Sequence, residues 1–167
     1  MQNMAHHLRV RRGVFFCGLK YAALALLFSA LVSFFWRIFL VFMGVEVKDQ
    51  DALVMLGDSA TPALTILSIV FMSVVVSPVA EEFVFRYFLQ GWLARVMKRL
   101  GFAIGLTALV FAACHLSLTA FMPLVVVSVC CSLSYVRSGS ILAPVVTHAL
   151  FNLVAVGTAL FSGDGGF

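Results

Sequence analysis

A few ionisable and amide side chains stand inside otherwise apolar stretches of this sequence. These side chains are Glu81, Glu82, Arg86, His115, His148 and Asn152. Charged groups in hydrocarbon are costly, need partners and usually mark functional sites. Two carboxylates, two imidazoles and a carboxamide can supply the base, the orienting group and the oxyanion donor of a hydrolytic site.

The spacing of the acidic and basic residues suggests how they divide their roles. Successive residues of a helix are about 100° apart, so Glu81 and Glu82 point in different directions. Arg86 follows Glu82 by four residues, in the order that favours an ion pair on one helix face. This pairing leaves Glu81 free as a base, an activator of a nucleophile or a ligand. Alternatively, both glutamates serve only to neutralise Arg86.

Two chemistries use these groups. In the first, Glu81 and His115 activate a water molecule while His148 and Asn152 stabilise the tetrahedral oxyanion. In the second, Glu81, His115 and His148 bind zinc, and the metal generates the hydroxide. The sequence lacks a local HExxH pattern, and we favour the metal-free version. Asn152 follows His148 by four residues, so its carboxamide either donates to the oxyanion or orients the imidazole.

The composition points to a membrane as the solvent that surrounds these groups. Of the 167 residues, 63% are hydrophobic and 11% charged, whereas a soluble domain has about 45–50% apolar and about 25% charged residues. Apolar runs, the longest of which can cross a bilayer, lie at about 19–43, 62–76, 102–116, 124–135 and 141–161, and 80–97 remains helical in character. We predict an all-α, polytopic transmembrane helical bundle that forms one domain over 1–167, with a catalytic core at about 62–161.

The basic residues are segregated, so the net charge of +4 predicts no nucleic-acid partner. Lys and Arg collect in cytoplasmic loops, which favours a cytoplasmic N-terminus, an outer loop at 46–59 and a single net crossing by 62–97. The segments 77–78, 117–123 and 137–140 are expected to interrupt helices. Helix lengths then bring Glu81, His115, His148 and Asn152 to one polar cavity, at a level in the cytoplasmic half of the bilayer.

Three motifs occur in order on successive hydrophobic segments between Ser77 and Asn152: EExxxR, FxxxH and HxxxN. With these three motifs in this order, the chain resembles the CAAX protease and bacteriocin-processing family of intramembrane proteases, also called the CPBP or Abi family. The resemblance implies that Glu81 is the catalytic glutamate, with Glu82 and Arg86 as its partners. It also implies that His115, His148 and Asn152 complete the site. Many members carry a metalloprotease label by analogy, so the resemblance leaves the zinc question open.

We therefore expect an intramembrane endopeptidase that acts on a membrane-associated protein or peptide in the bacterial inner membrane. The small size of the chain resembles the glutamic-type intramembrane proteases of bacteria that process C-terminal sorting anchors. Two alternatives are a small proton-coupled transporter, in which the charged groups form a relay, and a non-catalytic Abi-like membrane immunity protein that binds a membrane peptide.

Overall fold

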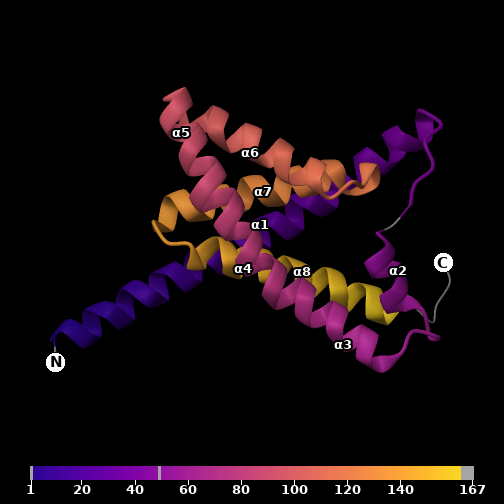
Figure 1. Cartoon of the computed structure of the whole chain (residues 1–167), viewed down its shortest axis with the longest axis horizontal. Coiled ribbons are helices and arrows are strands. Elements are labelled where there is room, and N and C mark those ends of the chain that lie inside the picture. Colours follow the sequence, from indigo (N-terminus) through magenta and orange to yellow (C-terminus); the bar gives the residue numbers. More distant parts are fainter. Residues whose placement is uncertain (1, 49, 163–167) are drawn as a thin grey trace.

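Long apolar helices that run in alternating directions make up the chain in its computed structural model, which describes residues 2–48 and 50–162 (Figure 1). The helices are α1 (Gln2–Phe42), α2 (Asp51–Gly57), α3 (Ala63–Phe71), the π-helical η1 (Met72–Val76), α4 (Ser77–Glu82), the π-helical η2 (Phe83–Gln90), α5 (Gly91–Met97), α6 (Leu100–Cys114), α7 (Leu118–Ser138) and α8 (Leu142–Ser162). The described part of the chain contains no strand.

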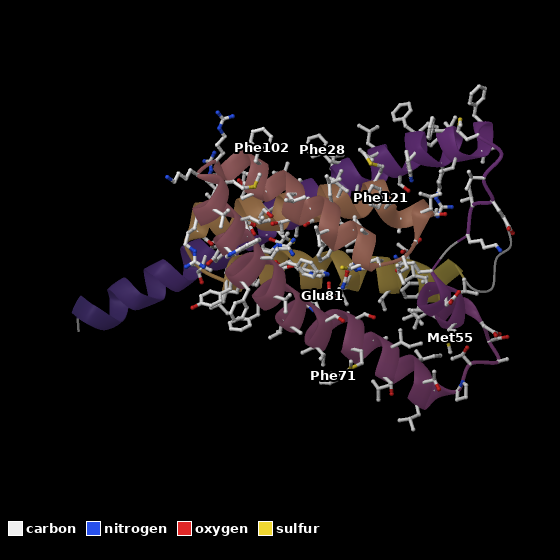
Figure 2. All side chains as sticks on the ribbon, turned by 45° about the horizontal axis from the view of Figure 1, so that its top comes forward. Phe28, Met55, Phe71, Glu81, Phe102 and Phe121 are labelled. Carbon is white, nitrogen blue, oxygen red and sulfur yellow. The ribbon has the colours of Figure 1, made fainter. Side chains whose placement is uncertain are left out.

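Four helical stretches are long and apolar enough to cross a membrane: Gly13–Phe42, Ala63–Met97, Leu118–Ser138 and Leu142–Phe161. Large apolar side chains such as Phe28, Phe71 and Phe102 are about half exposed on the outside of the bundle, and Figure 2 shows them on different helices. A lipid bilayer is the solvent in which such a surface is stable. The predicted all-α, polytopic membrane bundle is confirmed.

The stretch Ala63–Met97 is one continuous helical run, as a single crossing requires. Pro78 does not break it, although proline has no N–H and its ring crowds the carbonyl one turn earlier. The π-helical turn η1 ends two residues before Pro78. Such a turn shifts the hydrogen-bond register, so the helix accommodates the proline without a break.

Three expected boundaries were wrong. The expected outer loop 46–59 contains the short helix α2. The expected break at 117–123 is confined to the turn before Leu118, because the Ser117 hydroxyl accepts from the Ala120 N–H and caps α7, and Pro123 lies inside that helix. The first helix begins at Gln2 rather than at about residue 19, since no proline precedes its apolar part.

Small residues let α1 approach α8 closely. The Thr147 hydroxyl donates to the Gly18 carbonyl at 3.1 Å, and a Cβ at Gly18 would lie 2.8 Å from Cβ of Val146. Farther along α1, Tyr21 and Ala25 pack on buried residues of α7, including Val127. These contacts pack α1, α7 and α8 against one another.

The chain direction sorts the charges to two ends of the bundle. Figure 1 shows the start of α1, the end of α5 and the α7–α8 turn at one end, and residues 43–48 and 50–62 at the other. We call the first the basic end, because it carries Arg95, Lys98, Arg99 and Arg137, and the second the loop end. As predicted, the run from Ala63 crosses only once, so these four basic residues share one end.

Candidate active site

The Glu82–Arg86 pair forms the buried base of the site. The Arg86 Nε lies 2.9 Å from the Glu82 Oε2, and both side chains are fully buried. The Arg86 Nη2 also donates to Oγ and to the carbonyl oxygen of Ser128 on α7. The spacing of four residues therefore predicted the pair, and the pair ties α4 and η2 to α7.

His148 connects the two glutamates. Its Nδ1 lies 2.8 Å from Oε1 of Glu82, and a carboxylate can only accept, so Nδ1 carries the proton. Its Nε2 points the other way and lies 4.0 Å from Oε2 of Glu81. The imidazole is thus fixed by the buried pair and presents one nitrogen to the outer glutamate.

His115 approaches Glu81 from the end of α6. Its Nδ1 lies 2.8 Å from the carbonyl oxygen of Phe111, so Nδ1 donates and Nε2 of the neutral ring is an acceptor. That Nε2 lies 3.9 Å from Oε2 of Glu81. The buried Phe111 ring packs on both histidines, with centroid distances of 4.8 Å to His115 and 5.7 Å to His148.

Glu81, His115, His148 and Asn152 all line one cavity of about 340 Å³. Figure 2 places Glu81 midway along the bundle, between Phe102 near the basic end and Met55 near the loop end. The predicted convergence of these four side chains is confirmed. The side chain of Glu81 is 27% exposed and lines the cavity, in contrast with the fully buried Glu82, so Glu81 is the glutamate nearer to a molecule in the cavity.

Asn152 is held by the backbone of η1. Its Nδ2 donates to the Ser73 carbonyl at 2.8 Å. That carbonyl is free of its usual helical partners, because the Ser77 N–H donates to Met72 instead and Pro78 has no N–H. The side chain of Asn152 fills this gap, and one Nδ2 hydrogen remains for another acceptor. No bond between Asn152 and His148 is present among the described contacts, so the carboxamide does not orient the imidazole directly.

The spacing of the candidate zinc ligands does not suit an ion. Zn–N and Zn–O bonds of about 2.0–2.1 Å in a tetrahedral site place ligand atoms ~3.3 Å apart, whereas both histidine Nε2 atoms lie 3.9–4.0 Å from the Glu81 Oε2. Over the described ranges, no group of three or more His, Cys, Asp or Glu side chains is arranged to hold a metal ion.

Several supporting residues were not predicted from the sequence. They are Ser73, Pro78, Phe111 and Ser128. Pro78, three residues before Glu81, and Phe111, the first residue of the FxxxH motif, were visible signals. Ser73 acts through its carbonyl, which any residue carries, and Ser128 is one of several serines on its helix, so neither could have been singled out.

A comparison with protein-family models gives a match over the site. The model of Rce1-like type II CAAX prenyl endopeptidases matches residues 62–154, which is more than half of the chain and contains all six predicted site residues. Searches of curated proteins and of solved structures gave no match. The matched segment runs from the start of the Glu81 helix to just past Asn152. The chain therefore belongs to the Rce1-like CAAX endopeptidases, a family of intramembrane proteases.

Proposed function

We propose that this protein hydrolyses a peptide bond of a membrane-associated protein or peptide with a water molecule activated by Glu81 and His115. One observation carries the proposal: the Glu81 Oε2 and the His115 Nε2, both acceptors, face each other at 3.9 Å across the cavity. One water molecule can donate a hydrogen bond to each of them. Its lone pairs then remain available for attack.

The proposed reaction needs no other co-reactant. Glu81 takes a proton from the water molecule while the water oxygen bonds to the carbonyl carbon of the substrate. The carbonyl oxygen then becomes the oxyanion of a tetrahedral intermediate. When the C–N bond breaks, the protonated Glu81 returns the proton to the leaving nitrogen. Positioned acid–base groups of this kind contribute about 10²–10⁴-fold to the rate.

His148 and Asn152 are the proposed donors to the oxyanion. Glu81, Glu82 and Arg86 together carry one net negative charge, and a protonated His148 makes the cluster neutral. Neutrality matters because three of these side chains are only 0–4% exposed, where an uncompensated charge is costly, while Glu81 is 27% exposed. The protonated ring donates to Glu82 through Nδ1 and has Nε2–H for the oxyanion, and the second Nδ2 hydrogen of Asn152 supports it.

We further propose that the protein lies in a bacterial inner membrane with its N-terminus in the cytoplasm. The support is the collection of basic residues at one end of the bundle (Figure 1). The alternatives, a proton-coupled transporter and a non-catalytic immunity protein, gain no support from membership in a protease family. The substrate is proposed only as a class, a protein or peptide anchored in the same membrane.

The test compares membrane-protein termini by mass spectrometry in cells that carry wild type or an equally expressed Glu81→Gln variant. We expect one terminus to disappear in the variant while its uncut precursor accumulates. Asp58→Asn is the matched control, since Asp58 is an exposed carboxylate that lines neither this cavity nor the neighbouring hollow. Identical termini in wild type and Glu81→Gln, in cells with a phenotype that depends on Glu81, would contradict the proposal.

A further inference from the structure

The cavity reaches Glu81 from one end of the bundle. Beyond Glu81 and His148, its wall continues along α3 and η1 to Ile69 and along α8 to Val156. Both stretches run towards the loop end. The part of the wall that is formed by α1 and the first turns of α7 also runs in this direction. Of the described residues that line the cavity, none belongs to η2, α5 or the α7–α8 turn.

The buried Glu82–Arg86 ion pair closes the cavity towards the basic end. Glu82 and Arg86 lie directly behind Glu81 on the side of the basic end, and both are fully buried. Arg86 is also bonded to Ser128, and the Phe111 ring packs 4.9 Å from its guanidinium carbon. A substrate or water molecule coming from the basic end would have to separate these contacts.

At the loop end the cavity continues into a second hollow of about 520 Å³, between residues 46–48 and 50–51 of one segment and the α6–α7 turn. The two hollows share a set of lining residues: Lys48, Gln50, His115, Ser117 and Thr119. The backbone N–H of Lys48 donates to the Thr119 hydroxyl, so the segment crosses the mouth without filling it. Leu56 of α2 is buried against the same cavity wall.

The charges assign a side of the membrane to this mouth. Lys and Arg are concentrated on the cytoplasmic side of membrane proteins, and Arg95, Lys98, Arg99 and Arg137 lie at the basic end (Figure 1). The loop end instead carries Glu46, Asp51 and Asp58, with Lys48 among them. The mouth therefore opens on the extracytoplasmic side, although His148 is only seven residues into α8 from the basic end.

We propose that the substrate is a membrane-anchored polypeptide whose scissile bond is presented from the extracytoplasmic side, through the mouth between residues 46–48 and 50–51 and the α6–α7 turn. The cleavage part of this proposal rests on the proposed function, whereas the direction of access rests on the cavity alone. The sequence predicts a site in the cytoplasmic half of the bilayer, and this proposal adds that the site is reached from the opposite side, because the cavity extends towards the loop end.

The test is thiol labelling in intact cells with a charged maleimide that does not cross membranes. The background is Cys114→Ala, because Cys114 is the exposed native cysteine and the other three are partly or fully buried. The probes are Ser73→Cys on η1 and Ala155→Cys on α8, two elements that line the cavity. The controls are the exposed Ser59→Cys at the loop end and Gly101→Cys at the basic end. A Cβ added at Gly101 meets nothing within 4 Å.

We expect both probes and Ser59→Cys to be labelled to the same extent before and after the membrane is permeabilised, and Gly101→Cys only afterwards. Labelling of both probes only after permeabilisation, or labelling of neither while Ser59→Cys reacts, would overturn the proposal. So would a reversed result for the two controls. Because labelling needs no catalysis, the same pattern is expected with Glu81→Gln added, which separates failure of this proposal from failure of the proposed protease activity.

Discussion

His148 and Glu82 form the central contact of the site: the imidazole Nδ1 lies 2.8 Å from the carboxylate Oε1, and both side chains are almost completely buried. The same carboxylate pairs with Arg86 through its other oxygen. Glu82 is thus the common partner of a guanidinium and an imidazole. Its role is to fix the positions of charges, while the more exposed Glu81 faces the cavity.

Replacing Glu82 with Gln should therefore cost stability as well as activity. The variant leaves the Arg86 charge buried without its partner, and breaking a buried pair in this way costs about 3–5 kcal/mol. Thermal unfolding in detergent micelles measures the loss. Glu46→Gln is the control, since its exposed pair with Lys48 belongs to a class that contributes about 0–1 kcal/mol. Equal shifts for the two variants would show that the buried pair is not a stabilising element.

Asn152→Ala should lower kcat by about 10²–10³-fold, the usual cost of removing one oxyanion donor. KM should change little, because the interaction is made in the transition state. Steady-state kinetics with purified protein and the identified substrate measures both constants. Val154→Ala, an exposed position on the same helix, is the control. A raised KM with unchanged kcat would assign Asn152 to substrate binding instead.

Pro78→Ala should also lower kcat, but by a smaller factor than Asn152→Ala. The new N–H can bond to a carbonyl of η1 and compete with Asn152 for Ser73, which loosens the carboxamide without removing it. A double-mutant cycle tests this link, because effects of residues acting through one group are not additive. The Pro78→Ala/Asn152→Ala protein should be no slower than Asn152→Ala alone. Full additivity would show that Pro78 does not position Asn152.

Gly18→Ala should destabilise the bundle. The added Cβ would lie 2.8 Å from Val146 and 2.9 Å from the Ala143 carbonyl, and such overpacking typically costs about 1–3 kcal/mol. Gly157→Ala is the matched control on α8, where the added Cβ meets nothing within 4 Å, and a helical Gly→Ala change stabilises by about 0.5–1 kcal/mol. Unfolding midpoints that shift in the same direction would contradict the close α1–α8 approach.

Metal chelation should leave the activity unchanged, because the ligand spacing around Glu81 suits a water molecule better than zinc. The measurement is the cleavage rate of purified protein after incubation with a strong zinc chelator and removal of the complex. Loss of activity that added zinc restores would favour the metal version of the site, with Glu81, His115 and His148 as ligands.

Much of the fold and site followed from the sequence, for identifiable reasons. Apolar length predicted the spans, and the i, i+4 rule predicted the Glu82–Arg86 pair that the structure contains. Contacts made by backbone atoms were not predictable, since the Ser73 carbonyl and the Phe111 carbonyl carry no sequence signature. The direction of the cavity also escaped prediction. It depends on which segments cover each end, and α2 was expected to be a loop.

The π-helical turn η1 sets the angular position of Glu81. Ile69, Ser73, Ser77 and Glu81 follow one another at intervals of four residues, and all line the cavity. In a regular α-helix, at about 100° per residue, the twelve residues from Ile69 to Glu81 would carry the glutamate about 120° around the axis. A π turn holds roughly one additional residue, which returns about 100° of that rotation. If 72–76 became regular α-helix without a change of length, Glu81 would turn by about 100° away from the cavity. Deleting one residue at the same time would restore its direction, so the length of this segment and its π-helical geometry must match.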